Sequence, residues 1–367
     1  MRFKKELDNI KVYEAGKPIE LVVREFGVHP ENIIKMASNE NPYGTPKRVI
    51  DTIVDRATHS YRYPDDSMFE LKDKLSKKFS VSEKNIIIGA GSDQIIDFAI
   101  KSKCHKDSKI LTAGVTFAMY EIYARHVGAR VIKTPSKEHN IEEFKELYKK
   151  EQPEIVFLCL PNNPLGDSLD ASEVEEFIKI TDPHTLVVLD GAYQEYASTK
   201  DAKKRIDPKY FIEKYPNILY LGTFSKAYGL GGLRVGYGIA RENIIEALMK
   251  LRPPFNITNI SLAAAIVALD EYEFIETSIK ENFSQMTKFE KFLTKIGLKY
   301  IQSYTNFITI LFSKEDSTQI SDILLKEGII VRNLASYGIN GIRVTIDRPK
   351  NNERFLQRLE QIISLED

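Results

Sequence analysis

The chain has 367 residues, of which 43% are hydrophobic and 28% are charged. Its 52 lysines and arginines balance its 52 aspartates and glutamates, so no net charge draws it to nucleic acid or to an anionic membrane. This length accommodates one large and one small domain, or two domains of similar size.

Cellular location is indicated by what the sequence lacks. The N-terminal residues have no apolar core of the kind a signal peptide needs, and no run approaches 18 uncharged apolar residues. Cys104 and Cys159 lie far apart without CxxC spacing, which argues against a disulfide framework and a thiolate metal site. We therefore expect a cytoplasmic protein that binds no metal.

Short apolar runs alternate with longer amphipathic stretches from about residue 85 to residue 240. The runs are 85–88, 109–111, 130–132, 155–160, 185–189, 218–221 and 235–239. Such short runs of valine, isoleucine and leucine are typical of strands covered on both faces. They predict an α/β fold with a mostly parallel sheet flanked by helices. Capping boxes predict helix starts at residues 67–70 and 172–175.

The pattern changes after residue 254, where long helices are followed by strands near 307–310 and 342–344. We predict a large domain over residues 31–253 and a smaller α+β domain over residues 254–367. Residues 1–30 are expected to form an arm or to join the small domain.

Unusual segments follow the predicted strands, at the edge where open α/β sheets bind ligands. Gly91 and Ser92 lie where a strand turns into a helix, so N–H groups and the helix dipole there can bind an anion. The stretch is no dinucleotide fingerprint, because Gln94 stands in place of the third glycine. A purely structural turn is the alternative.

Other strand ends carry side chains suited to an aromatic cofactor. Asp190 ends an apolar run and is expected to be buried, where a protonated ring nitrogen would supply its cationic partner. Asn163 and Tyr193 can donate to a phenolate oxygen, and Phe117 can stack on a ring face. The alternatives are a helix N-cap for Asp190, a turn for Asn163 and a core position for Phe117.

Lys226 follows the run 218–221, and partial desolvation there favours a neutral, nucleophilic amine that can form a Schiff base. Thr223 and Ser225 offer hydroxyls beside it, and Arg234 offers a planar fork suited to a phosphate. Glycines between these residues allow close approach of a ligand. An aldehyde that carries a phosphate satisfies every feature, so pyridoxal 5'-phosphate (PLP) is the predicted cofactor. The alternative is an ordinary surface lysine.

The sequence lacks the motifs of metal binding, nucleotide hydrolysis and serine esterase activity. The six histidines show no HExxH or other paired metal spacing. The sequence contains no GxxxxGK[ST] phosphate loop and no GxSxG elbow. Nucleotide hydrolysis and serine esterase chemistry are therefore not expected.

Three motifs together resemble the class I/II PLP-dependent aminotransferases of fold type I, and the resemblance spans nearly the whole chain. They are Pro161-Asn162-Asn163-Pro164-x-Gly166, Asp190-x-x-Tyr193 and Ser225-Lys226-x-x-Gly229-x-x-Gly232-x-Arg234-x-Gly236. The resemblance implies that Lys226 bonds covalently to PLP and shuttles the proton, and that Asp190 pairs with the ring nitrogen.

The same resemblance implies the remaining cofactor contacts. Tyr193 and Asn163 reach the phenolate oxygen, and Phe117 stacks on the ring. The phosphate is held by Gly91, Ser92, Ser225 and Arg234, with Tyr63 reaching it from the neighbouring subunit. The implied active unit is a homodimer.

Residues 37–44, 61–65 and 343–345 are similar to the branch of this family that acts on histidinol phosphate. This likeness implies that Arg332 and Arg343 bind the phosphate ester and the glutamate carboxylates. Residues that match family positions near the substrate are Tyr13, Asn39, Asn163 and Asn256. The implied reaction transfers an amino group between L-histidinol phosphate and 2-oxoglutarate in histidine biosynthesis.

Alternatives stay open on the sequence. They are an aromatic amino acid aminotransferase, a decarboxylase of phosphate-bearing substrates and a non-catalytic PLP-binding regulator. A surface salt bridge is the alternative for each arginine. Leu165 and Phe117 depart from the family's usual threonine and tyrosine, and charged Asp347 and Arg348 follow the terminal strand near the substrate end, where the family commonly has Gly-Thr.

Overall fold

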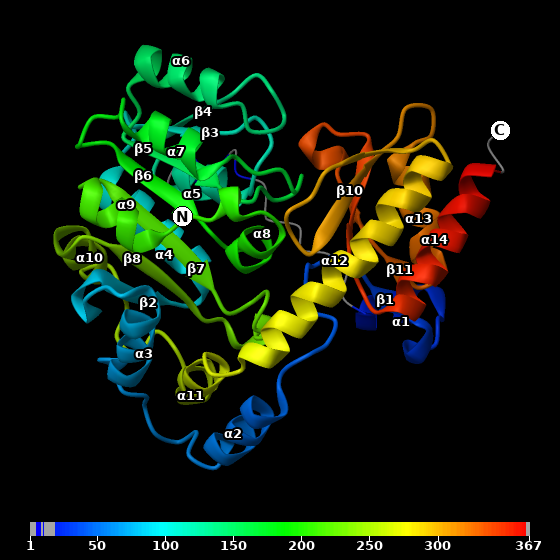
Figure 1. The fold of residues 1–367 in the computed structure, drawn as a ribbon, viewed down its shortest axis with the longest axis horizontal. Helices are drawn as coiled ribbons and strands as arrows, with labels where there is room; N and C mark the ends of the chain where they lie inside the picture. The colour runs from blue at the N-terminus through cyan, green and yellow to red at the C-terminus, as the bar shows by residue number, and fades with distance from the viewer. Residues whose placement is uncertain (1–4, 9, 11–18, 365–367) are drawn as a thin grey trace.

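The computed structural model describes residues 5–8, 10 and 19–364, which fold into two halves around separate sheets (Figure 1). The strands of the large sheet, in spatial order, are β2 (Ile86–Gly89), β8 (Gly236–Ala240), β7 (Ile218–Thr223), β6 (Leu186–Asp190), β5 (Ile155–Cys159), β3 (Lys109–Thr112) and β4 (Arg130–Lys133). β8 runs antiparallel to β2 and β7, and the other neighbours are parallel. The predicted α/β fold is confirmed, and each of these strands overlaps a predicted apolar run.

Helices cover both faces of the large sheet, because successive strand side chains point to opposite faces. One face carries α4 (Gly91–Lys103), α5 (Met119–His126) and α10 (Glu242–Met249). The other carries α3 (Phe69–Phe79), α6 (Ile141–Glu151), α7 (Ala171–Ile178), α8 (Gln194–Lys200) and α9 (Pro208–Lys214). Val188 packs on the α4 and α5 side, so Asp190, two residues later on β6, faces that side too.

The smaller half contains an antiparallel sheet of β12 (Arg332–Asn333), β13 (Gly341–Thr345), β10 (Phe307–Leu311) and β9 (Lys299–Ile301). Its helices are α12 (Tyr272–Lys295), α13 (Ser317–Lys326) and α14 (Pro349–Ser364). Phe289 of α12, Ile342 of β13 and Phe355 of α14 are fully buried in their shared core. This half is the smaller α+β part that the sequence predicts.

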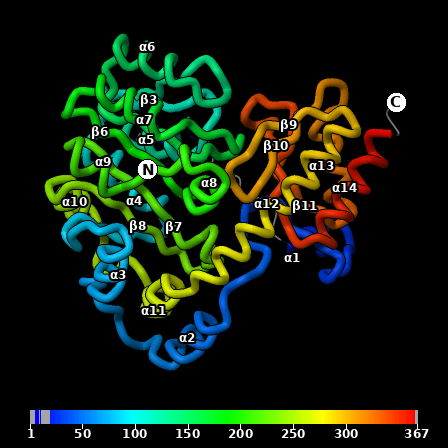
Figure 2. The backbone as a smooth tube through the Cα atoms, viewed as in Figure 1, coloured from blue at the N-terminus to red at the C-terminus, as the bar shows by residue number. Residues whose placement is uncertain are grey.

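Two N-terminal segments pack on the smaller half, and the long helix α12 contributes to the cores of both halves. β1 (Ile34–Lys35) pairs in parallel with β11 (Ile329–Ile330), and α1 (Ile19–Phe26) contacts α13. α11 (Asn259–Ala268) packs against α2 (Lys47–Ala57) and α3, and the long α12 runs from beside α11 to the small sheet (Figures 1 and 2). The division of the chain at residues 30 and 253 stays a prediction.

Short 3-10 helices complete the described elements: η1 (Lys5–Leu7), η2 (Pro30–Asn32), η3 (Glu83–Asn85), η4 (Ala202–Lys204), η5 (Gly231–Leu233) and η6 (Ala335–Tyr337). None of the helices in the described part of the chain combines the length and apolar character needed to cross a bilayer.

Both predicted capping boxes were wrong in position. α3 begins at Phe69, whose backbone N–H donates to the Asp65 carboxylate at 3.1 Å. α7 has its box two residues earlier, formed by Asp170 and Glu173. An aspartate upstream of each serine supplied the stronger acceptor.

Candidate active site

The ends of β5, β6 and β7 lie side by side at one edge of the large sheet. Cys159 is in register with Asp190, and Asp190 is in register with Leu221. The segments that follow these strands contain Asn163, Tyr193 and Lys226. The parallel order of the strands therefore brings together residues that are about 30 positions apart in the chain.

Lys226 lies beyond β7 with its amine enclosed by polar groups. Its Nζ donates to the Ser38 carbonyl oxygen at 3.2 Å and lies 5.6 Å from the centre of the Tyr193 ring. Burial lowers the pKa of Lys226 to about 7, and the positive charge of Arg343 acts in the same direction. A substantial part of this amine is therefore neutral near neutral pH, as nucleophilic chemistry requires.

Asp190 ends β6 and is 3% exposed. Its Oδ2 accepts a hydrogen bond from the Tyr120 hydroxyl at 2.7 Å, and its Oδ1 accepts one from the Ala192 N–H at 3.1 Å. Burial raises the pKa of Asp190 despite these two donors. Within the described residues no lysine, arginine or histidine forms an ion pair with it, so a protonated ring nitrogen fits the position.

A small cup for an anion lies between β2 and the start of β8. Gly91 has φ +76°, and a Cβ there would come within 2.5 Å of the Arg234 Nη2. A Cβ on Gly236 would come within 2.1 Å of the Ser92 nitrogen. Only glycines allow the guanidinium and the first turn of α4 to lie this close.

Arg234 is itself held in the cup. Its φ is +53°, which is uncommon for a residue with a side chain. Its Nη1 donates to the Ser225 Oγ at 3.2 Å and to the Gly231 carbonyl at 3.1 Å. The Ser225 N–H donates to the Thr223 hydroxyl at 3.1 Å, which orients that loop. Guanidinium, hydroxyls and a helix N-terminus together suit a phosphate, so the amine, the carboxylate and this cup fit PLP.

Tyr193 belongs to a hydrogen-bonded cluster that spans both halves. Its hydroxyl accepts from the Asn39 Nδ2 at 2.8 Å, and the Asn39 N–H donates to the Thr345 hydroxyl at 3.0 Å. Arg343 donates to the Asn163 Oδ1 at 2.5 Å and to the Ala37 carbonyl at 2.6 Å. The structure thus brings Asn39, Asn163, Tyr193 and Arg343 close to Lys226.

Arg332 and Arg343 are direct cross-strand partners on β12 and β13. Residues opposite each other in an antiparallel pair point to the same face, and like charges in that position repel. A cavity of about 510 Å³ is lined by Arg332, Phe117 and Tyr120, although Lys226 does not line it. A negatively charged ligand at this face would relieve the repulsion. Tyr13 lies outside the described residues.

Tyr63 lies apart from this cluster. It is 80% exposed, and its ring stacks on Phe255 with the centres 4.6 Å apart. Phe117 lies edge-to-face with Tyr120 at 5.6 Å, beside the cavity. Within the single chain the structure brings Phe117, and not Tyr63, to the ring end of the site.

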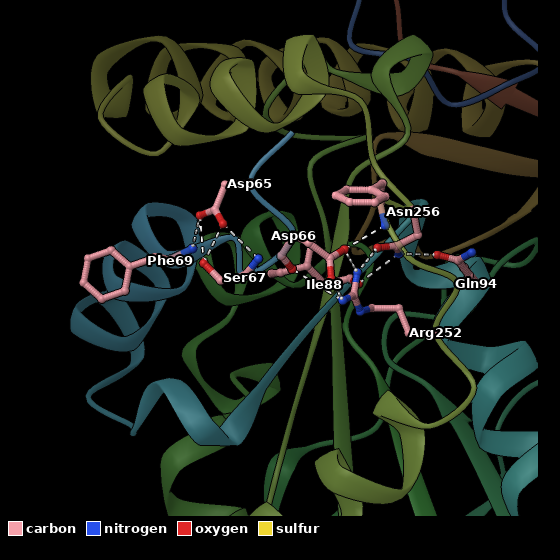
Figure 3. A network of polar contacts seen from close by, with 9 residues as sticks. Asp65, Asp66, Ser67, Phe69, Ile88, Gln94, Arg252 and Asn256 are labelled. Atoms are coloured by element: carbon pink, nitrogen blue, oxygen red, sulfur yellow. Dashed lines mark hydrogen bonds and ion pairs between the residues drawn. The ribbon is translucent and has the colours of Figure 1, made fainter. Parts of the chain in front are cut away.

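Asn256 lies in a polar network that ties the Tyr63 segment to the anion cup (Figure 3). Arg252 forms a fork with Asp66, at 2.9 and 2.7 Å, and donates to the Asn256 Oδ1 at 2.8 Å. The Asn256 Nδ2 donates to the Gln94 Oε1 at 2.7 Å, and the Ala90 N–H donates to that oxygen at 2.8 Å. Both ends of the Asn256 amide have partners here, and its contact with substrate stays a prediction.

Sequence reasoning missed Tyr120 and the Asp66–Arg252 pair. Tyr120 is the second residue of α5 and lies three residues after Phe117, a spacing that gave a weak signal that a second aromatic side chain enters the same region. The position of Gln94, where a dinucleotide site has glycine, gave a signal for the network, because a polar side chain at a tight turn needs partners.

The fold and the site define a PLP-type α/β enzyme of the transferase kind. The structure is similar to the crystal structure of histidinol-phosphate aminotransferase from Sinorhizobium meliloti in complex with pyridoxal-5'-phosphate, with a TM-score of 0.90, 24% identity and coverage of 100% of this chain and 98% of that one. It is also similar to an aspartate aminotransferase double mutant from Thermus thermophilus, with a TM-score of 0.85, 18% identity and coverage of 99% and 100%. These identities support the fold alone.

Sequence comparison is more specific. The model of the family "Aminotransferase class I and II" matches residues 31–359. Histidinol-phosphate aminotransferases from Wolinella succinogenes and Aliarcobacter butzleri are 57% and 58% identical over 364 residues, which cover 99% of this chain and 99% of each relative. The chain belongs to the class I and II aminotransferases.

Proposed function

We propose that this chain transfers an amino group between L-histidinol phosphate and 2-oxoglutarate, with PLP as its cofactor, in histidine biosynthesis. The products are imidazole acetol phosphate and glutamate. The observation that carries the chemistry is the Lys226 amine, whose pKa is lowered to about 7 beside Tyr193 and Arg343. The names of the relatives at 57–58% identity support the choice of substrate.

The residues of the site would hold PLP at each of its functional groups. Asp190 would bind the ring nitrogen, Tyr193 and Asn163 the phenolate oxygen, and Phe117 one ring face. The phosphate would be bound by Gly91, Ser92, Thr223, Ser225 and Arg234. When bound, PLP supplies an aldehyde for the covalent bond to Lys226 and an electron sink for the substrate carbon that loses its proton.

Lys226 is the proton carrier. Its neutral Nζ would accept the proton from the substrate carbon that bears the amino group and would hold it for return later in the turnover. A pKa near 7 suits both directions, because the amine is neither permanently charged nor a poor acid. Asp190 would pair with the ring nitrogen in its protonated form.

Arg332 and Arg343 would bind the phosphate ester of histidinol phosphate and, in the second half-reaction, the carboxylates of glutamate. Their cross-strand position supplies two positive groups on one face. Asn39 donates to the Tyr193 hydroxyl, and Asn163 accepts a hydrogen bond from Arg343. Both asparagines would orient the substrate. Tyr13 and Asn256 are further proposed contacts.

A cytoplasmic homodimer is the proposed working form. Tyr63 and Phe255, with Tyr61, Phe69 and Tyr272, are exposed aromatic residues on the α2, α3 and α11 side of the chain. Burial of such residues against a second copy would be favourable, and the Tyr63 hydroxyl would reach the partner's phosphate. The small-molecule substrates require neither nucleic acid nor membrane.

The direct test is a single turnover. Histidinol phosphate is added to the PLP-bound protein, and conversion of the cofactor to its amine form is followed by absorption, with glutamate release then measured on addition of 2-oxoglutarate. No conversion would remove the proposed substrate. Arg332→Gln should reduce kcat/KM for histidinol phosphate about tenfold more than for phenylalanine; equal losses would favour an aromatic aminotransferase, and released carbon dioxide a decarboxylase.

A further inference from the structure

Tyr120 is held rigidly beneath the ring end of the site. It is fully buried at the start of α5. Its ring stacks on Phe157 of β5, with the centres 4.4 Å apart and the planes at 11°, and meets the edge of Phe117 at 5.6 Å. Contacts on two sides leave the side chain no alternative rotamer without repacking the core, so the direction of its hydroxyl is fixed.

The hydroxyl points at Asp190 and stays protonated. It donates to the Asp190 Oδ2 at 2.7 Å. Burial and the nearby Asp190 charge raise the pKa of Tyr120 well above its ordinary value, so the group remains a donor throughout the working pH range. The Ala192 N–H occupies the other carboxylate oxygen. Two fixed donors on different oxygens leave the carboxylate a single orientation, with lone pairs still available for a ligand.

The surroundings of Asp190 otherwise oppose its charge. Burial raises the pKa of Asp190, and the negative charge of Asp93 on α4 acts in the same direction. The Tyr120 hydroxyl and the Ala192 N–H act against them. The thiol of Cys159 on β5 also faces this group, and burial raises its pKa, so it carries no charge. Tyr120 is therefore the side chain whose hydrogen bond favours the ionised form of the buried carboxylate.

We propose that Tyr120 is a positioning residue for the transamination reaction. Its hydrogen bond holds the Asp190 carboxylate in the orientation and the ionised form that a protonated ring nitrogen needs. Without the bond, the proton between the ring nitrogen and Asp190 shifts toward the carboxylate, and the ring withdraws electrons less strongly. This inference rests on the proposed function and assigns Tyr120 a role that it exerts through Asp190.

The test replaces the hydroxyl alone. Tyr120→Phe, purified with PLP bound, is titrated with acid and base while the visible absorption of the cofactor is followed. The midpoint of the absorption change should move upward by about half a unit to one unit, because a less positive ring makes the lysine-bound nitrogen more basic. The kcat should fall about tenfold, with KM for histidinol phosphate changed less than about twofold.

Tyr148→Phe is the matched control. Tyr148 is also buried, and its hydroxyl bonds to Thr185 and accepts from the Asp182 N–H, at the opposite end of β6 from Asp190. Its loss should reduce thermal stability without moving the absorption midpoint. If Tyr120→Phe behaved in the same way, the proposed role would be overturned.

A second variant keeps the test decisive even if Tyr120→Phe fails to fold. Incorporation of 3-fluorotyrosine at position 120 keeps the ring and makes the hydroxyl a stronger donor, so the midpoint should move downward. An unchanged midpoint would overturn the inference. Failure of the proposed function is distinct, because the unmodified protein would then bind no PLP or convert no histidinol phosphate.

Discussion

Two parts of the site are built in different ways: the ring end, where Asp190, Tyr193 and Tyr120 would face the cofactor ring, and the outer rim, formed by Tyr63 and Phe255. Asp190, Tyr193 and Tyr120 are buried, and each is fixed by hydrogen bonds within the chain. Tyr63, on the rim, is 80% exposed and contacts only the exposed ring of Phe255 among the ring contacts of the described residues. Burial within one chain therefore sets the chemical state of the ring-end groups, whereas the exposed Tyr63 and Phe255 are where the proposed second copy would pack.

The largest effect should come from the amine at the ring end. Lys226→Ala should lower the transamination rate by at least about 10⁴-fold, because both the covalent bond and the proton carrier are lost. The rate is measured as glutamate released from 2-oxoglutarate. Lys250→Ala, which removes an exposed lysine, is the control and should leave the rate unchanged. A Lys226→Ala protein with normal turnover would refute the assigned chemistry.

The pH dependence of PLP capture should separate a buried amine from an exposed one. Apoprotein should bond PLP covalently at a rate that rises with pH around a midpoint near 7, since the pKa of Lys226 is about 7. At pH 7 a lysine with its ordinary pKa would have a neutral fraction roughly a thousandfold smaller. Stopped-flow absorption measures the rate, and a midpoint above 9 would contradict the desolvated amine.

The lowered pKa of Lys226 also makes the stability of the apoprotein depend on pH. The unfolded chain binds the Lys226 proton more tightly than the folded chain, so this group makes the apoprotein more stable as pH rises from about 7 to about 10. Lys226→Ala should remove that contribution from a pH series of urea unfolding curves.

Asp190→Asn should separate function from stability at the ring end. The rate should fall about 10²- to 10³-fold, because a neutral amide cannot stabilise the positive ring. The apoprotein should be at least as stable as the unmodified one, and increasingly so as pH rises, since the raised pKa of Asp190 means that the folded chain loses this proton less readily than the unfolded chain. Asp51→Asn, in an exposed pair with Lys47, is the control. A stability loss in Asp190→Asn would indicate a structural role.

The rim should show the smallest and most concentration-dependent effects. Tyr63→Phe should lower PLP affinity about tenfold, because it removes the proposed contact of the Tyr63 hydroxyl with the phosphate in the second copy. Asp66→Asn weakens the fork to Arg252 and should lower PLP affinity a few-fold through the hydrogen bonds that lead to Asn256 and Gln94. Equilibrium binding across a range of protein concentrations measures both. A Tyr63→Phe effect that persists in dilute monomer would argue against a contribution from the second copy, whereas the Asp66→Asn effect should persist there, because its network lies within one chain.

The elements that could best be predicted from the sequence are the strands whose residues are buried on both faces of the sheet. Strands covered on both faces produce uninterrupted apolar runs, so the large sheet and the strand-end positions of Asp190 and Lys226 could be predicted from local pattern. Tyr120 and Asp190 are 70 positions apart, and Arg252 and Asp66 are 186 apart. Neither pair leaves a local signature, because each polar partner becomes visible only when the chain is folded. The strands β1 and β11 could not be predicted either, because each has only two residues, which is too short to show a periodic pattern.

The reversed direction of β8 has a consequence for ligand size. Because β8 runs opposite to β7, Gly236 is in register with Thr223, and the chain passes from one to the other through residues 224–235 without crossing the sheet. A parallel strand would start at the far edge and carry Arg234 about 16 Å away, the length of a five-residue strand. The distance between the Lys226 amine and the Arg234 guanidinium is instead set by this single connection. We therefore expect the site to favour aldehydes in which the spacing between the aldehyde and the phosphate matches that distance.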